Sequence, residues 1–155
     1  MNKVIKKLKI NDIHSQNILG KDVVVAVLDS GISPHPDFED RILYFKDFVN
    51  NKTTPYDDEG HGTHVSGIVA GSGKLSHGIM KGVAPKSKII SIKVLNNKGI
   101  GREKHVLNGL HWIVDNGKKY NIKVVNLSFG TLNNNDTQNK KLIDEVELLW
   151  DLGYV

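Results

Sequence analysis

Short apolar runs alternate along the chain with stretches in which apolar residues recur at helical spacing. Three runs, residues 23–28, 88–95 and 124–127, are almost continuously apolar and rich in β-branched residues. Such runs are typical of parallel strands that are covered on both faces. Two amphipathic stretches, 102–120 and 140–152, follow the second and third runs and predict helices. The alternation predicts an α/β fold with a doubly wound parallel sheet and right-handed crossovers.

The last residues indicate how far this fold extends. The stretch 140–152 ends at Gly153, a residue type that commonly stops a helix, and Tyr154 and Val155 have the character of another strand's first step. No internal repeat or linker divides the chain. We therefore expect residues 1–155 to be the N-terminal part of one domain, truncated before its later strands.

Composition narrows the class of protein. Hydrophobic residues make up 39% and charged residues 25%, as in globular proteins. No stretch approaches the roughly 18 apolar residues of a membrane span, and no apolar signal-peptide core follows the basic start, so we expect no membrane partner and a cytoplasmic location. The net charge is +4, but no basic stripe interleaved with aromatics occurs, so no nucleic-acid partner is expected. The absence of cysteine excludes disulfides and thiolate chemistry.

Asp29 follows the first apolar run directly and opens the string Asp29-Ser30-Gly31. Ligands and catalytic groups in open α/β sheets lie beyond the carboxyl ends of the strands. A carboxylate here would be held rigidly by its strand, and Gly31 would allow a sharp exit turn. Taken alone, the pattern favours a simpler interpretation, an Asp that caps the next turn.

A second polar segment, 58–67, reads DEGHGTHVSG and becomes a helix. His61 falls at or near the helix N-terminus, where the positive end of the helix dipole favours a neutral imidazole. The glycines on both sides would let other backbone approach the ring closely. His64, one turn further on, is predicted to be a packed, hydrogen-bonded helix residue.

Two further strand ends could offer their backbone to an extended peptide by strand addition. One comprises Ser128, Phe129 and Gly130, and the other comprises Gly99, Ile100 and Gly101. Taken separately, both are ordinary strand-end turns.

Four motifs together resemble the subtilisin-like serine proteases (subtilases) in sequence, order and spacing, and they resemble the cytoplasmic bacterial members most of all. The motifs are VVVAVLDSGI, HGTHVSGIVAG, GVAPKSKIISIKVL and VVNLSFG. The resemblance runs from about residue 14 to residue 155. It implies a serine endopeptidase acting on polypeptides, in which Asp29 is the catalytic carboxylate and His61 the general base. It also implies that 128–130 line the substrate pocket and that 99–101 pair with the substrate backbone.

The family's nucleophile lies in a Gly-Thr-Ser-Met-Ala-type motif, and its oxyanion Asn follows a later strand. Neither is present in this sequence, and Asn126 lies before the substrate segment. We therefore expect the chain to be inactive alone, with the missing C-terminal half of the domain as its partner. The chemistry requires no cofactor. The resemblance also points to a structural calcium at Asp37, although the loop 72–80 offers no carboxylate and hard cations need several oxygen ligands.

Two alternatives remain open. Asp29, His61 and His64 could be the ligands of a metal hydrolase, because a spacing of three can place both imidazoles on one helix face. The chain could instead be a non-catalytic peptide-binding or interaction module on a degenerate subtilase fold. The missing serine favours the module, and the intact Asp and His disfavour it.

Overall fold

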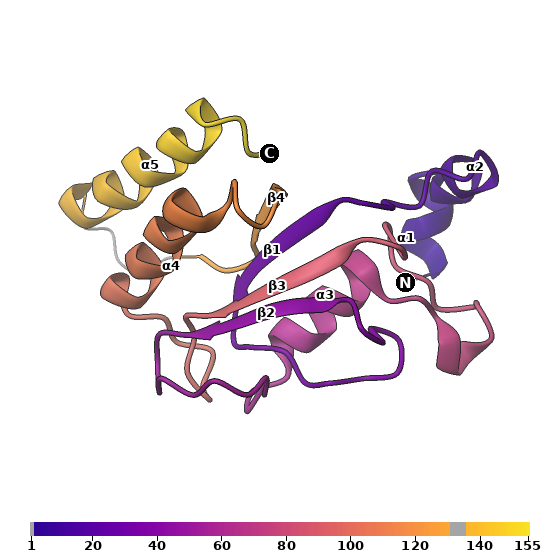
Figure 1. Ribbon diagram of the computed structural model, residues 1–155, viewed down its shortest axis with the longest axis horizontal. Coiled ribbons are helices and arrows are strands. Elements are labelled where there is room, and N and C mark those ends of the chain that lie inside the picture. Colours follow the sequence, from indigo (N-terminus) through magenta and orange to yellow (C-terminus); the bar gives the residue numbers. More distant parts are fainter. Residues whose placement is uncertain (1, 131–135) are drawn as a thin grey trace.

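The computed structural model describes residues 2–130 and 136–155 of the chain. Its centre is a four-stranded sheet in the order β2-β3-β1-β4, in which every pair is parallel (Figure 1). The strands are β1 (Val24–Asp29), β2 (Ile42–Asp47), β3 (Lys88–Lys93) and β4 (Ile122–Leu127). The helices are α1 (Asn2–Lys7), α2 (Ile10–Ser15), α3 (His61–Ala70), α4 (Glu103–Asn116) and α5 (Asp136–Asp151), with a 3₁₀ turn at Lys74–Ser76. The predicted doubly wound parallel α/β fold is confirmed.

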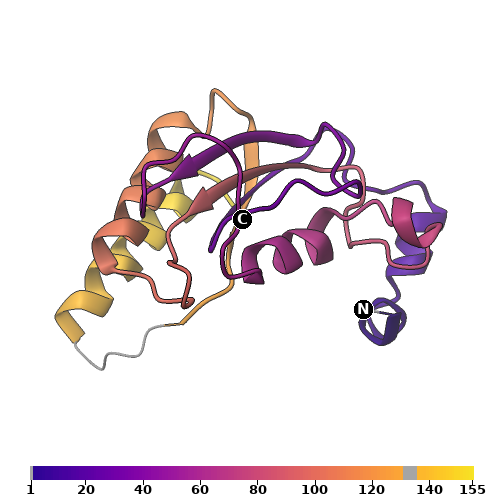
Figure 2. The ribbon, with the colours of Figure 1, turned by 90° about the horizontal axis from the view of Figure 1, so that it is seen from below.

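The two faces of the sheet bury separate cores because successive side chains of a strand point to opposite sides. Val25, Val27 and Ile89 pack with Val65 of α3. Leu28 and Ile92 face the other way, toward α4 and the end of α5. Figure 2 shows α3 apart from α4 and α5, with the strands between them. Burial on both faces explains why β1 and β3 read as near-continuous apolar runs.

The structure differs from the prediction in three elements. The strand β2 was not expected, because as an edge strand it buries only Phe45 and Asp47 fully and so lacks an apolar run. The short helices α1 and α2 were not expected either. The Asn-rich segment 132–139 reads in the sequence as a surface connection. Residues 132–135 lie outside the described residues, and residues 136–139 belong to α5.

The backbone after α5 lies beside β4, as predicted for the start of another strand. The amide of Val125 donates to the carbonyl of Val155 (2.8 Å), and the amide of Val155 donates to the carbonyl of Lys123 (3.1 Å). Tyr154 is buried at this point. The side of β4 that faces away from β1 therefore pairs with residues from beyond α5.

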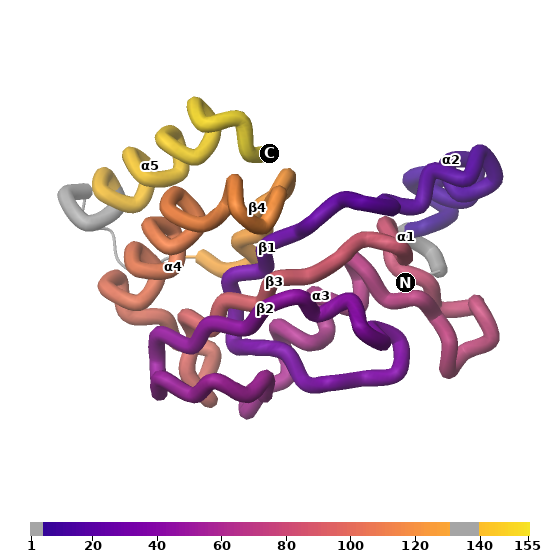
Figure 3. The backbone as a smooth tube through the Cα atoms, viewed as in Figure 1, coloured from indigo at the N-terminus to yellow at the C-terminus, as the bar shows by residue number. Residues whose placement is uncertain are grey.

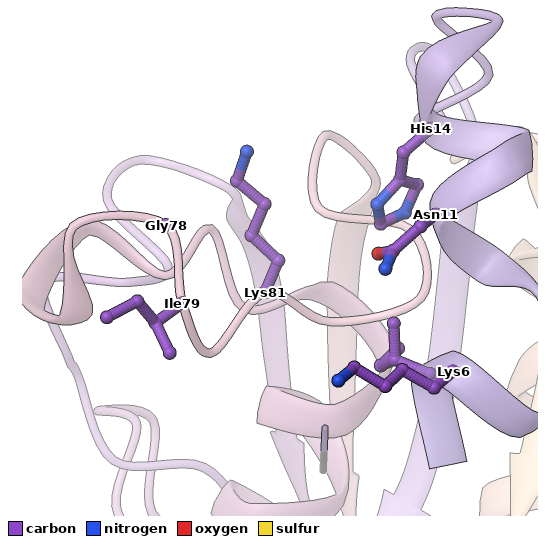
Figure 4. A pocket seen from close by; sticks show the side chains of 7 residues that line it. Lys6, Asn11, His14, Gly78, Ile79 and Lys81 are labelled. Atoms are coloured by element: carbon purple, nitrogen blue, oxygen red, sulfur yellow. The ribbon is translucent and has the colours of Figure 1, made fainter. Parts of the chain in front are cut away.

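The first two helices lie at the far end of the sheet from α4 and α5, beside the loop that follows α3 (Figure 3). The Nε2 atom of His14 is 2.9 Å from the carbonyl oxygen of Val83. A hollow of about 340 Å³ lies here and is lined by Ile5, Lys6, Asn11, His14, Gly78, Ile79 and Lys81 (Figure 4). No helix in the described part of the chain is long and apolar enough to cross a membrane.

Large apolar side chains are exposed on α5 and at the C-terminal residue. The exposed fractions are 54% for Ile143, 70% for Trp150 and 74% for Val155. Exposed apolar surface binds hydrophobic dyes and promotes association, and the free edge of a sheet adds to that tendency. We expect the 155-residue chain, expressed alone, to bind such a dye strongly and to sediment as more than a monomer. A monodisperse monomer with a cooperative thermal transition would contradict this.

Candidate active site

Three neighbouring strands end in charged residues at the carboxyl edge of the sheet. Asp29 ends β1, Lys93 ends β3 and Asp47 ends β2, and Lys93 is in register with both aspartates. All three are almost fully buried. Asp29 is two residues after Val27, so its side chain points to the same face of the sheet, the face that α3 covers. The other two charged residues are in register with it and lie on that face as well. The topology therefore gathers buried charge where open α/β sheets place their sites.

Asp47 organises the turn that follows β2. Its carboxylate accepts hydrogen bonds from the amides of Val49 (2.8 Å) and Asn50 (2.9 Å) and from the hydroxyl of Tyr56 (2.8 Å). Burial alone would raise the pKa of Asp47, but these hydrogen bonds outweigh it and hold the pKa below the ordinary value. Burial of Tyr56 and its contact with the Asp47 carboxylate raise the pKa of the Tyr56 hydroxyl to about 12.

This arrangement predicts loss of stability in acid. Because the pKa of Asp47 is lowered by folding, its stabilising effect is present above the ordinary aspartate pKa and is lost as the pH falls below about 4. Asp47→Asn is expected to lower the free energy of unfolding by about 2 kcal/mol at neutral pH and to weaken its acid dependence. Asp144→Asn, at an exposed position of α5, is the matched control. Denaturant titrations at pH 3 to 7 measure both, and equal acid dependence in the two variants would contradict the prediction.

Asp29 and His61 form a hydrogen-bonded pair. Nδ1 of His61 lies 2.8 Å from Oδ1 and 3.0 Å from Oδ2 of Asp29. The amide of Ser30 donates to the same carboxylate (2.7 Å). A carboxylate only accepts hydrogen bonds, so the proton of a neutral imidazole is on Nδ1 and Nε2 carries the lone pair. Asp29 is 1% exposed, whereas 44% of the His61 side chain is open to solvent.

Two glycines allow the helix α3 to approach β1 closely enough for this pair. A Cβ atom on Gly62 would lie 2.3 Å from the carbonyl oxygen of Gly31 and 3.0 Å from Cβ of Asp29. Gly31 has a φ of +124°, and a Cβ there would lie 2.2 Å from the carbonyl oxygen of Tyr56. Only glycine fits either position without backbone movement.

The start of α3 is held by Asp57, which sequence reasoning missed. Its carboxylate accepts from the amides of Gly60 (2.8 Å) and Thr63 (2.8 Å) and from the hydroxyl of Thr63 (2.5 Å). The hydroxyl of Ser30 donates to it (2.8 Å) and accepts from the amide of Gly62 (2.9 Å). Burial would raise the pKa of Asp57, but these hydrogen bonds lower it overall. The N-cap position itself is Gly60, so no capping pattern in the sequence points to Asp57.

The environment of His61 favours its protonated form. The hydrogen bond that the ring donates to Asp29 is the largest effect and raises the pKa of the imidazole. Partial burial opposes this, and the charges of Asp29, Glu59 and Asp57 add to the rise. The ring therefore combines an outward-facing Nε2 with increased basicity, which are the properties of a general base.

Comparison of the chain with known proteins finds one family. The model of the subtilase family matches residues 20–149. The chain is 42% identical over 147 residues to the serine protease AprX of Bacillus subtilis, covering 92% of this chain and 33% of that protein. It is 41% identical over 128 residues to subtilisin of Bacillus pumilus, covering 81% of this chain and 44% of the relative. A cold-adapted subtilisin-like serine proteinase superposes with a TM-score of 0.65 at 30% identity, over 83% of this chain and 45% of that one.

The chain belongs to the subtilase family. Subtilases are serine peptidases that act on polypeptides. The chain spans between a third and a half of the length of the relatives above. The resemblance seen in its motifs is therefore confirmed at the level of the family and the fold.

The two segments that the subtilase resemblance assigns to substrate lie at the same edge of the sheet. Ser128 and Gly130 follow β4 directly and are exposed, and Phe129 is half-buried. The segment 99–101 returns toward β3, where Gly101 bridges Leu95 and the carbonyl of Ile100 accepts from the amide of Asn96 (3.0 Å). A Cβ on Gly99 would lie 3.9 Å from Oε1 of Glu59, whose other oxygen accepts from the amide of His61 (2.8 Å). Substrate binding by these segments stays a prediction.

His64 does not share the site. It is exposed on α3, so the expectation of a packed side chain is wrong, and its side chain makes no hydrogen bond to any described residue. Within residues 2–130 and 136–155, no group of three or more His, Cys, Asp or Glu side chains could hold a metal ion. Asp29, His61 and His64 therefore do not form the site that the metal-hydrolase alternative requires.

Asp37, the calcium ligand suggested by the subtilase resemblance, is occupied with local hydrogen bonds. Its carboxylate accepts from the amide of Leu75 (2.9 Å), and its carbonyl accepts from the amide of Ser72 (3.0 Å) and from the Arg41 guanidinium. Within the described residues, no group of three or more His, Cys, Asp or Glu side chains gathers around it, whereas calcium takes several oxygen ligands. Calcium at Asp37 stays a prediction from the resemblance alone.

Proposed function

We propose that this chain is the part of a serine endopeptidase that supplies the carboxylate, the general base and two substrate-binding edges. The observation that carries the proposal is the bond between Nδ1 of His61 and the buried carboxylate of Asp29 (2.8 Å). This bond fixes one tautomer of the ring and turns Nε2 outward, toward the place where a nucleophile is needed. Residues 1–155 would then form the N-terminal portion of the catalytic domain.

The chemistry follows from this pair. Nε2 of His61 takes the proton of a serine hydroxyl as the hydroxyl attacks the scissile carbonyl, because serine is a poor nucleophile until a base removes its proton. Asp29 stabilises the imidazolium that forms and does not itself become protonated. The imidazolium then gives its proton to the leaving amine. The chain contains no Gly-Thr-Ser-Met-Ala-type motif, so the serine comes from a segment outside these residues.

The extended peptide would lie between the segments 99–101 and 128–130. The first segment follows β3 and the second follows β4, and these two strands pair with β1 on its two sides. Both segments present backbone at the carboxyl edge of the sheet. Backbone pairing with such edges gives affinity with little dependence on side chains. The polypeptide is therefore held with its scissile bond beside His61.

The test compares two proteins: the 155-residue chain, and the longer protein read from the DNA in frame beyond codon 155. The chain alone is expected to hydrolyse no fluorogenic peptide, and the longer protein is expected to hydrolyse it and to be inactivated by a sulfonyl fluoride. A genuine stop at codon 155, with peptide binding by the chain that survives His61→Ala, would instead establish a non-catalytic binding module. Hydrolysis by the longer protein that resists the sulfonyl fluoride would overturn the serine mechanism.

A further inference from the structure

Lys93 is a fully buried cation beside the Asp29–His61 pair, and the chemistry above does not use it. It lies between Asp29 and Asp47 in the register of the sheet, and its side chain is 0% exposed. A buried ammonium is stable only when it is paired and its hydrogens have acceptors. Nζ donates to the Asp58 carboxylate (2.6 Å), to the carbonyl of Leu95 (2.9 Å) and to the carbonyl of Ser30.

Each of these acceptors belongs to a segment on which the site depends. Ser30 donates its amide to the carboxylate of Asp29 (2.7 Å), and its hydroxyl accepts from the amide of Gly62 (2.9 Å). Asp58 lies three residues before His61 in the loop that leads into α3. Leu95 bridges Gly101, the end of one substrate segment. One ammonium therefore joins the end of β1, the loop before His61 and the turn after β3.

We infer that Lys93 is a positioning residue that holds Asp29 and His61 in their hydrogen-bonded arrangement by fixing the Ser30 carbonyl and the Asp58 loop. The inference rests on the proposed function, because it assigns Lys93 to the same site. Lys93 does not touch the reacting atoms. It acts through the peptide that follows Asp29 and through the loop that delivers His61.

If Lys93 acted only through its charge, its removal would change the pKa of His61 in the opposite direction. The positioning role and the electrostatic role can therefore be distinguished by experiment. A cation near His61 disfavours the imidazolium, so removing its charge would raise the pKa of the ring. Loosening the Asp29–His61 hydrogen bond would instead lower that pKa, because this bond is the largest effect that raises it. The direction of the change in the pKa therefore reports which role Lys93 has.

The experiment uses the peptidase that contains this chain and four variants of it. Lys93→Met removes the ammonium, and Lys93→Met/Asp58→Asn removes both members of the ion pair and leaves the net charge unchanged. The double variant is expected to fold, because it leaves no buried charge without a partner, and the side chain of Asp58 lies at a position that is 37% exposed. Lys88→Met is the matched control, since Lys88 begins the same strand and is exposed. The titration of the His61 ring is followed by NMR, with His61→Ala identifying its signal, and peptide hydrolysis gives kcat and KM.

We expect both Lys93 variants to lower the pKa of His61 and to lower kcat about 100-fold, the cost of displacing a catalytic group by about 1 Å. KM and all values for Lys88→Met should stay unchanged. An unchanged or raised pKa in the double variant, with kcat retained, would overturn the inference. Loss of the fold in both variants would overturn the inference as well, because Lys93 would then be needed for the stability of the fold and not specifically for the position of Asp29 and His61. If the parent protein lacks peptidase activity, the proposed function fails, and the NMR titration still decides the role of Lys93.

Discussion

His61→Ala is expected to lower kcat for peptide hydrolysis about a millionfold in the protein that contains this chain. Subtilisin, a relative of this protein, is the reference for that magnitude, because removal of its triad histidine has an effect of this size. Without the ring, nothing at the site can take the serine proton. His64→Ala is the matched control, because His64 is exposed on the same helix and should leave kcat within a few-fold of the parent.

The assignment of Asp29 is tested in the same assay. Asp29→Asn is expected to lower kcat about ten-thousandfold, because the ring loses the partner that fixes its tautomer. The double variant Asp29→Asn/His61→Ala should be no slower than His61→Ala, since the residues act as a unit. Full activity in His61→Ala, with folded protein, would refute the choice of base. A large loss in His64→Ala alone would show that the other histidine is the base.

The pH dependence of the activity follows from the same hydrogen bond. In the proposed mechanism His61 acts as a base only when it is neutral, and its raised pKa is expected to place the rise in kcat/KM above pH 6.5. The stability effect has the opposite sign. Because folding raises this pKa, the protonated pair stabilises the fold below about pH 6.5, and that contribution is lost as the pH rises through the folded value. Activity and this part of the stability therefore change in opposite directions with pH.

Much of this site could be predicted from the sequence because the residues that define it lie in short, unusual strings. Asp29 comes directly after a buried strand, and His61 stands between glycines at a helix start. In the structure, Nδ1 of His61 lies 2.8 Å from the carboxylate of Asp29. A parallel sheet brings the carboxyl ends of β1 and β2 to one edge, and the chain after β2 leads from that edge into α3, so the two strings could be expected to lie near each other.

The supporting residues could not be predicted in this way. Lys93 reads as a single polar residue within an apolar strand, and nothing local indicates that its ammonium is buried against Ser30 and Asp58. Asp57 holds α3 from a turn whose path only the tertiary structure fixes. The strand β2 was missed for a related reason: an edge strand that covers the core with one side need not be apolar throughout.

Gly62→Ala is expected to separate α3 from β1 by adding one methyl group at their point of contact. The new Cβ would lie 2.3 Å from the carbonyl oxygen of Gly31, a backbone atom that cannot rotate away. The helix must then move from β1, so we expect a loss of stability of about 1–3 kcal/mol or more and a drop in kcat of about 100-fold.

Gly67→Ala is the matched control for this prediction. Gly67 lies in the same helix, and a Cβ placed on it would meet nothing within 4 Å. Alanine is the better helix former, so this variant should gain about 0.5–1 kcal/mol and keep its activity. Denaturant midpoints and kcat, measured together for the two variants, separate crowding from helix propensity. If Gly62→Ala behaved like Gly67→Ala, the close approach of α3 to β1 would not be what holds His61 against Asp29.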